Sequence, residues 1–308
     1  MKLNKNASTN ILIVGLGVIG GSYARALTKR GYTVSTITKE QSSIDYAKEH
    51  GFISYGTTQI EPEIIQKADI IVFALYPHDF VEWIEKYQQN FKSGTLITDV
   101  TGVKSSIVYK VQDVLRDDVE FVPAHPMAGR ERSGVEFSDD SVFIGANYII
   151  TPTEKNTPEA IETCEELGRE LGFSKISVLS PEEHDEMIGF VSQLTHCIAV
   201  ALMTCKECDH LVDYTGDSFR DLTRIAQIND RMWSELFAEN KENLIEQMEI
   251  FEKEFSKMKE LIKNDNTEDL REMMRLSTKR RSLFNKKKQE VYRYEYEFYQ
   301  KAPHSEGR

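Results

Sequence analysis

Apolar residues in the first half of the chain occur in short runs, and stretches with helical spacing separate them. The first run, Ile11-Leu12-Ile13-Val14, leads into a G-x-G-x-x-G pattern, Gly15 to Gly20. The residues that follow keep apolar side chains at helical spacing through Ala24 and Leu27. This order predicts a strand, a tight turn and a helix.

The same alternation continues to residue 179. Strands separated by helices of this length are typical of βαβ units, with right-handed crossovers and ligands at the carboxyl ends of the strands. The expected strands are Tyr32–Ile37, Phe52–Tyr55, Ala68–Leu75, Thr95–Val100, Val119–Val122, Asn147–Thr151 and Lys175–Leu179, with helices at Ser43–His50, Asp79–Asn90, Lys104–Leu115 and Glu159–Leu171.

The pattern changes at Ser180-Pro181-Glu182-Glu183, which is typical of a capping box with proline in the first helical turn. Helical periodicity dominates from there, including long amphipathic segments at 232–263 and 267–299 that need a partner surface. We therefore predict an α/β Rossmann-type dinucleotide-binding domain at 1–179, an all-α dimerisation domain at 180–300 and a tail at 301–308.

The first helix of the second domain carries a polar stripe. Asp185, Gly189, Ser192 and His196 recur at intervals of three and four, with Gln193 beside them. This stripe fits either a network between helices or a surface that faces a ligand. The apolar positions between them are expected to pack in the core: Met187, Phe190, Val191, Leu194 and Ile198.

Composition narrows the class of protein. A net charge of −12 argues against nucleic acid as a partner. We see no apolar run close to the roughly 20 residues of a membrane helix, and we expect a cytoplasmic protein without membrane contact. Four cysteines fit a reducing compartment. Cys205 and Cys208 lack a second pair at zinc-site spacing, so we predict no metal site.

The glycine pattern predicts the dinucleotide site. Gly15 permits the turn, Gly17 lets a pyrophosphate approach the backbone, and Gly20 allows close packing of helix on strand. The helix N-terminus favours the negative charge of the diphosphate. We expect the residues between the glycines and those at the end of the strand Ala68–Leu75 to line this site: Leu16, Val18, Ile19, Tyr76 and Pro77.

The end of the second predicted strand bears on the choice of cofactor. An acidic residue there hydrogen-bonds the ribose 2′-hydroxyl of NAD, whereas a 2′-phosphate needs a basic or hydroxyl environment. The chain has Thr38-Lys39-Glu40 at this point. Thr38 and Lys39 favour NADP, and Glu40 leaves NAD open. Lys39 also fits a solvated loop charge.

A candidate base follows the strand Val119–Val122. His125 lies between Pro123 and a glycine- and arginine-rich loop, and Pro126 keeps the histidine in an extended conformation. Imidazole accepts a proton near neutral pH. At a strand end of a dinucleotide fold, His125 is therefore predicted to remove a hydroxyl proton as hydride leaves the same carbon.

Three segments together resemble the prephenate/arogenate dehydrogenase family of tyrosine biosynthesis, over residues 10–285. They are His125-Pro126-Met127-Ala128-Gly129, Ser192-x-x-x-His196 and Phe219-Arg220-Asp221-x-Thr223-Arg224-Ile225-Ala226. The resemblance implies a Rossmann domain, a helical domain that forms a homodimer, and oxidative decarboxylation of prephenate to 4-hydroxyphenylpyruvate. Arogenate as the substrate is the alternative.

The resemblance also implies roles for single residues. His125 matches the catalytic histidine, His196 a substrate-site histidine, and Arg224 the arginine that binds a substrate carboxylate. Glu131 falls near the site. Two positions depart from the family pattern: Gly102 stands where many members have a serine, so that Thr101 is the candidate to supply the hydroxyl, and Gln193 stands where some have a second histidine.

Two other readings fit parts of the pattern. A β-hydroxyacid dehydrogenase shares the domain order, but the helical half has no obvious lysine with an asparagine four residues on. A dinucleotide-binding redox sensor that signals through its helices needs no base. His125 and Arg224 argue against it.

Overall fold

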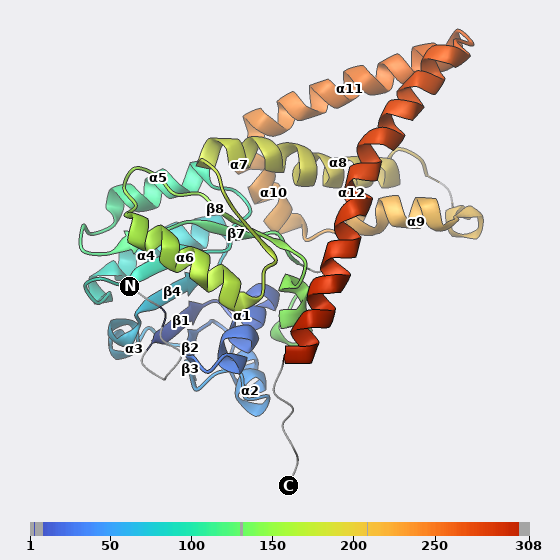
Figure 1. Cartoon of the computed structure of the whole chain (residues 1–308). Helices are drawn as coiled ribbons and strands as arrows, with labels where there is room; N and C mark the ends of the chain where they lie inside the picture. The colour runs from blue at the N-terminus through green and yellow to red at the C-terminus, as the bar shows by residue number, and fades with distance from the viewer. Residues whose placement is uncertain (1–2, 4–8, 130–131, 208, 302–308) are drawn as a thin grey trace. The chain divides into compact units, whose positions relative to one another are not determined.

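The computed structural model describes residues 3, 9–129, 132–207 and 209–301, and side chains as far as residue 284 (Figure 1). The chain forms two compact units, residues 1–244 and 245–308. The first contains both sheets and the helices through α10. The second contains most of α11 (Lys241–Lys263) and all of α12 (Thr267–Lys301).

Six parallel strands form the main sheet, and their order is β3-β2-β1-β4-β5-β6. This is the strand order of a Rossmann fold, with the chain reversing direction across the sheet beside β1. The predicted α/β class is therefore confirmed. The strands are β1 (Asn10–Val14), β2 (Thr33–Ile37), β3 (Tyr55–Thr57), β4 (Ile70–Phe73), β5 (Leu96–Asp99) and β6 (Glu120–Phe121).

Helices cover both faces of this sheet (Figure 1). Ile11 and Ile13 of β1 point to one face, whereas Leu12 and Val14 point to the other, and all four are buried because helices cover both. The first face packs against α1 (Val18–Lys29), α2 (Gln41–Glu49) and α6 (Pro158–Leu171), and the second against α3 (Pro62–Lys67), α4 (Pro77–Tyr87) and α5 (Ser105–Val114).

A second sheet contains the candidate base. Its strands are β7 (Ala124–Pro126), β8 (Asn147–Ile150) and β9 (Lys175–Val178), with β7 antiparallel to β8. His125 lies in β7, opposite Ile149. The predicted extended conformation holds, but the histidine belongs to a separate strand rather than to a segment projecting from β6. Pro123, which has no N–H to donate, lies between the two strands.

One continuous helix runs from Pro181 to Thr204, formed by α7 (Pro181–Ile188), a π-helical segment η4 (Gly189–Leu194) and α8 (Thr195–Thr204). It begins at the predicted capping box, because Ser180 Oγ accepts the Glu183 N–H and the Glu183 carboxylate accepts the Ser180 N–H. The short helices η5 (Leu211–Tyr214), α9 (Asp217–Thr223) and η6 (Arg224–Ala226) follow.

The expected long helix at 232–263 is two helices. α10 (Asp230–Glu239) ends before Asn240, and α11 starts at Lys241. The Asn240 side chain is buried, and its amide donates to the Asp185 carbonyl (2.9 Å) and to Gln193 Oε1 (2.8 Å). These two bonds hold the junction against α7 and η4.

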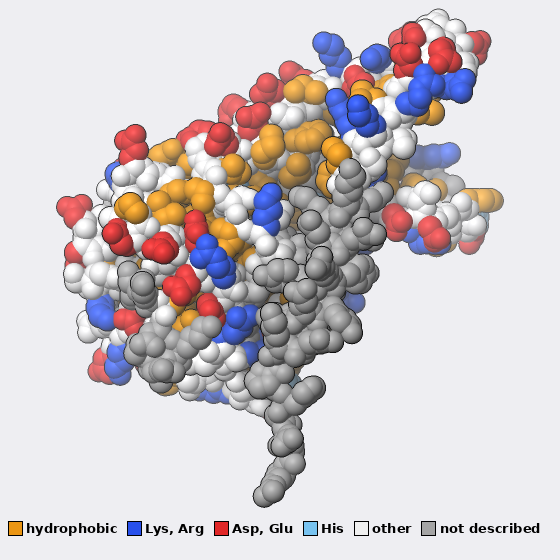
Figure 2. Space-filling view, viewed as in Figure 1, with side chains coloured by type: hydrophobic (Ala, Val, Ile, Leu, Met, Phe, Trp, Pro, Cys, Tyr) orange, Lys and Arg blue, Asp and Glu red, His pale blue; other side chains and the backbone are white. Residues whose placement is uncertain are grey.

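The helix Pro181–Thr204 corrects two expectations, that its apolar residues pack in the core and that the chain has no apolar segment close to the length of a membrane helix. Met187, Phe190 and Val191 were expected to pack in the core, yet each is 47–52% exposed. Figure 2 shows hydrophobic side chains gathered over this helix. By length and composition alone it is also apolar enough to cross a membrane, with a mean hydropathy of 1.6 over 18 residues, of which 28% are buried.

A buried ion pair joins the main sheet to the second sheet. Lys104 Nζ lies 2.7 Å from Asp99 Oδ2 at the end of β5, and both side chains are 0% exposed. Lys104 Nζ also donates to the Ala124 carbonyl (2.5 Å), while Asp99 Oδ1 accepts the Ala124 N–H (3.0 Å). Both backbone polar groups of Ala124, the residue before His125, therefore depend on this pair.

Removing one member of this pair should be costly. We expect Lys104→Met to lower the free energy of unfolding by about 3–5 kcal/mol, because it leaves the Asp99 charge buried without its partner. Chemical denaturation monitored by circular dichroism measures this loss. The Asp99→Asn/Lys104→Met double variant should recover part of it.

The surface pair Lys86–Glu82 is the control, since both of its side chains are about half exposed. Lys86→Ala should cost less than about 1 kcal/mol. Equal losses in Lys86→Ala and Lys104→Met would contradict the importance of the buried pair.

Candidate active site

The turn between β1 and α1 leaves space above a helix N-terminus. Gly15 has a positive φ of +94°, and a Cβ there would overlap the Ala74 carbonyl. A Cβ on Gly20 would overlap the Gly15 carbonyl. Gly17 differs from both, since it is exposed and a Cβ there would meet nothing within 4 Å. Two glycines are thus required by the turn and its packing, whereas Gly17 faces open space.

The remaining residues of this turn lie where the glycine pattern places them. Leu16 is buried, and Val18 and Ile19 form the first turn of α1. Their backbone N–H groups belong to the helix N-terminus, where four such groups lack helical partners. This geometry can hold an anion such as a diphosphate.

The end of β2 borders the same turn. Thr38 Oγ1 accepts the Leu16 N–H at 3.3 Å. The Lys39 side chain is 86% exposed, and its ammonium lies 3.3 Å from the Asp79 carboxylate in the first turn of α4. The Glu40 carboxylate lies at the start of α2, where it accepts a hydrogen bond from Ser43 Oγ (3.5 Å).

Tyr76 is the N-cap of α4 and Pro77 its first residue, at the carboxyl end of β4, and α10 reaches this edge of the sheet. The Asn229 amide donates to the Tyr76 hydroxyl (3.2 Å), and the His78 N–H donates to Glu235 (2.8 Å). Within unit 1, the helical part of the chain therefore packs against the edge that the glycine turn also occupies.

His125 is the first member of a hydrogen-bonded chain of three side chains. Its Nδ1 lies 2.9 Å from His184 Nε2, and His184 Nδ1 lies 2.7 Å from Asp185 Oδ1. The Asp185 carboxylate also accepts the backbone N–H groups of Lys104 (2.9 Å) and Ser105 (2.7 Å). Asp185 is thus surrounded by donors, which fixes His184 Nδ1 as a donor and His184 Nε2 as an acceptor.

The surroundings keep both imidazoles neutral. Burial lowers the pKa of His125 well below its usual value of 6.5, and the adjacent His184 and the Lys104 ammonium lower it further. Burial also lowers the pKa of His184, although Asp185 opposes this. His125 therefore gains a proton only when the pH falls well below 6.5. At neutral pH it is a neutral base.

Thr101 and Gly102 lie beside this histidine. The Thr101 side chain is 4% exposed, and its hydroxyl contacts the Asp99 carboxylate, the Val103 carbonyl (3.0 Å) and Lys104 Nζ (3.2 Å). Thr101 is therefore part of the buried ion-pair network. A Cβ at Gly102 would lie 3.9 Å from His125 Cε1 and 3.6 Å from the Leu236 side chain, so position 102 faces the histidine.

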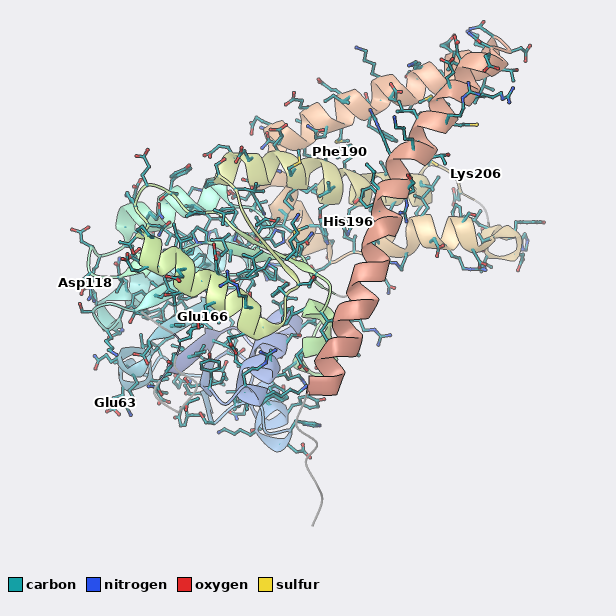
Figure 3. The ribbon with its side chains drawn as sticks, in the orientation of Figure 1. Glu63, Asp118, Glu166, Phe190, His196 and Lys206 are labelled. Carbon is teal, nitrogen blue, oxygen red and sulfur yellow. The ribbon has the colours of Figure 1, made fainter. Side chains whose placement is uncertain are left out.

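His196 lies on α8 and stacks on Trp233 of α10, with ring centroids 3.7 Å apart. Its Nδ1 lies 2.9 Å from the Ser192 carbonyl, one turn earlier. Figure 3 labels His196 on the same long helix as Phe190. Trp233 and Leu236 are three residues apart, so they share a face of α10. That face links His196 to Gly102, and so to His125.

The other predicted substrate residues lie in different settings. Gln193 is 1% exposed and both ends of its amide are bonded, since Nε2 donates to the Leu236 carbonyl (2.9 Å) and Oε1 accepts from Asn240. Arg224 is exposed at the start of η6, which packs against α8. Glu131 lies outside the described residues.

Sequence reasoning missed His184 and Trp233. His184 lies 59 residues from His125, and no spacing rule connects a helical residue to a strand at that distance. Its only signal was its place next to Asp185 in the first turns of a well-capped helix. The sequence placed Trp233 in an amphipathic helix but gave no signal of its contact with His196.

Comparison with known families covers most of the chain. Residues 23–177 match the family model "Prephenate dehydrogenase, nucleotide-binding domain", and residues 180–276 match "Prephenate dehydrogenase, dimerization domain".

Curated relatives and solved structures agree with this match. The chain is 28% identical to prephenate dehydrogenase of Bacillus subtilis, over 84% of this chain and 72% of the relative. It is 29% identical to cyclohexadienyl dehydrogenase of Zymomonas mobilis, over 88% and 94%. Its structure matches prephenate dehydrogenase from Aquifex aeolicus in complex with hydroxyphenyl propionate and NAD+, with a TM-score of 0.83, 33% identity and coverage of 90% and 98%. The chain belongs to the prephenate dehydrogenase family and is an oxidoreductase.

Proposed function

We propose that this enzyme converts prephenate to 4-hydroxyphenylpyruvate by oxidative decarboxylation, with hydride transfer to a nicotinamide dinucleotide. The observation that carries this proposal is the chain of contacts from His125 Nδ1 through His184 to Asp185, beside the carboxyl edge of a Rossmann sheet, which leaves Nε2 as the basic nitrogen of His125. The Aquifex aeolicus relative, solved with a hydroxyphenyl compound and NAD+, supports the substrate class. Arogenate is the alternative substrate.

The reaction needs one base for the ring hydroxyl and a substrate held so that the hydride can leave the same carbon. His125 takes the proton of the ring hydroxyl as hydride leaves the same carbon. The bond to the ring carboxylate then breaks, CO₂ departs, and its electron pair completes the aromatic ring. The ring oxygen recovers the proton from His125, so no proton is consumed overall. A positioned base of this kind contributes about 10²–10⁴-fold to the rate.

Substrate binding falls to residues of the helical part. We propose that Arg224 binds a substrate carboxylate through its planar pair of donors, and that His196, oriented by Trp233, borders the same site. Glu131, in the first domain and outside the described residues, stays a predicted substrate residue. Thr101 and Gln193 were predicted to touch the substrate. Because their polar atoms are hydrogen-bonded within the protein, we propose that Thr101 stabilises the buried ion pair and that Gln193 stabilises the packing of α10 beside the site.

The dinucleotide is assigned to the turn at Gly15–Gly20. When bound, its nicotinamide ring accepts the hydride. The open space at Gly17 and the N-terminus of α1 fit a diphosphate. We propose that NADP is preferred. Thr38 is not acidic, and the Glu40 carboxylate accepts a hydrogen bond from Ser43. Lys39 could turn from Asp79 to a 2′-phosphate at little cost, because its exposed ion pair with Asp79 is worth about 0–1 kcal/mol. NAD remains the alternative.

A second copy of the chain accounts for the exposed apolar face of the helix Pro181–Thr204. The matched dimerisation domain spans residues 180–276, so it includes this helix. Burying Met187, Phe190 and Val191 between two copies removes apolar surface from water at about 25 cal/mol per Å². We propose a homodimer that works in the cytoplasm, without nucleic acid or membrane.

The space at Gly17 gives a test of cofactor binding. Gly17→Ala should change the free energy of unfolding by less than about 1 kcal/mol, because its Cβ meets no protein atom. The same Cβ would occupy diphosphate space and should weaken dinucleotide binding at least about 10-fold, or 1.4 kcal/mol. Calorimetric titration with NADP and NAD measures this.

Gly20→Ala is the matched control. Its Cβ would overlap the Gly15 carbonyl, so it should destabilise the fold by about 1–3 kcal/mol. Unchanged nucleotide affinity in Gly17→Ala would rule out the turn as the diphosphate site.

The reaction itself is tested by turnover. Purified enzyme should reduce a nicotinamide dinucleotide with prephenate, faster with NADP than with NAD, and arogenate is assayed beside it. His125→Asn should lower kcat by about 10²–10⁴-fold with little change in nucleotide affinity. His50→Asn, a substitution of an exposed histidine at the end of α2, should have no effect. Failure of the wild-type enzyme with both substrates would refute the proposed function.

The dimer is tested by a charge on the apolar face. Phe190→Glu should convert a dimer into monomer in size-exclusion chromatography with light scattering, because the new carboxylate would be buried without a partner. Val178→Glu is the matched control, since Val178 is 48% exposed but lies on β9. A monomeric wild-type protein would refute the proposed dimer, and partitioning into membranes on fractionation would refute the proposed cytoplasmic location.

A further inference from the structure

The Asp185 carboxylate is held by two separate elements. It lies in the second turn of α7, and its two oxygens accept the N–H groups of Lys104 and Ser105 at the N-terminus of α5. Negative charge is favoured at a helix N-terminus by the dipole and by these unpaired donors. Burial would raise the pKa of Asp185, but hydrogen bonds from His184 and Ser105 outweigh it, and the pKa lies below its ordinary value. Asp185 is therefore a fixed anion.

His184 connects the Asp185 carboxylate to His125 through its two ring nitrogens. It is 0% exposed, and both of its ring nitrogens are used, one toward Asp185 and one toward His125. Because Asp185 can only accept, His184 carries its proton on Nδ1. His184 Nε2 must then accept, so the donor between the two rings is the Nδ1–H of His125.

We infer that His184 and Asp185 are positioning residues that hold His125 in the tautomer whose Nε2 lone pair faces the substrate hydroxyl. This inference rests on the proposed function. It also explains how the site works with glycine at position 102. A serine there would approach His125 from the Cε1 side, whereas His184 holds the ring through Nδ1.

Charged groups of both signs surround the two histidines. The groups that face this pair are Asp99 from β5, Lys104 before α5, and His184 and Asp185 from α7. The Lys104 ammonium, which lowers the pKa of His125, is ion-paired with Asp99, and the Asp185 carboxylate adds a further negative charge. When His125 gains a proton, its Nδ1–H continues to donate to His184, and the Asp185 anion lies one ring away. No other proton has to move.

Two substitutions that differ by one methylene group test this role. The amide of His184→Gln is long enough to donate to Asp185 and to accept from His125. His184→Asn keeps the donor to Asp185 but is too short to reach His125. We expect His184→Asn to lower kcat about 10²-fold, because His125 loses its tautomer preference. His184→Gln should stay within about tenfold of wild type, and KM should change less than kcat in both.

Two readouts separate positioning from loss of structure. Nitrogen-15 NMR of the histidine rings, without substrate, should show the His125 proton on Nδ1 in wild type and His184→Gln, and a mixture of tautomers in His184→Asn. The acid limb of the kcat profile should move in His184→Asn alone. Thermal denaturation and nucleotide affinity confirm that each variant is folded.

Several outcomes would overturn the inference. They are a wild-type spectrum with the proton on Nε2, equal losses of kcat in both variants, or normal turnover in His184→Asn. Because the NMR experiment needs no substrate, it tests the pair even if prephenate is not turned over. That failure would refute the proposed function alone.

Discussion

The rest of the site depends on the buried ion pair between Lys104 and Asp99. A charge in an apolar interior is tolerated only when a partner and further hydrogen bonds satisfy it. Here those further bonds go to Ala124, whose N–H and carbonyl are both bound by the pair. The strand that carries His125 is thereby tied to the end of β5, although it belongs to another sheet.

The position of His125 follows from this contact between the two sheets. One backbone segment, from Asp99 to Ser105, supplies the ion pair, the Thr101 hydroxyl and the two N–H groups that bind Asp185. It therefore fixes the strand on which His125 lies and also the helix from which His184 reaches it. The Gly15–Gly20 turn lies at the same edge of the main sheet, where α10 also packs. His125, this turn and the helical residues are brought together by this packing of β5, α7 and α10.

In the helix Pro181–Thr204, a short π-helical segment changes which side chains are buried and which are exposed. Its π-helical segment Gly189–Leu194 adds a residue to the turn, which departs from the 3.6-residue period assumed for the sequence. Gln193 consequently lies inside, bonded to Leu236 and Asn240, whereas Phe190 and Val191 lie outside. The buried polar network holds α7 to α10. The apolar side chains of Met187, Phe190 and Val191 stay exposed.

The sequence alone determined the Rossmann class, the turn at Gly15–Gly20, the capping box at Ser180 and the extended conformation at His125. Each depends on residues that are close together in the sequence: apolar runs, glycines that a turn requires, and a serine three residues before a glutamate. It missed the strand pairing of β7, the break at Asn240, the outward face of Phe190 and the contact of His184 with His125. These depend on side chains far apart in the chain, whose hydrogen bonds and burial exist only after the sheets and helices have packed. Tertiary structure therefore decided how His125 is held, because its tautomer depends on partners in space rather than on neighbours in sequence.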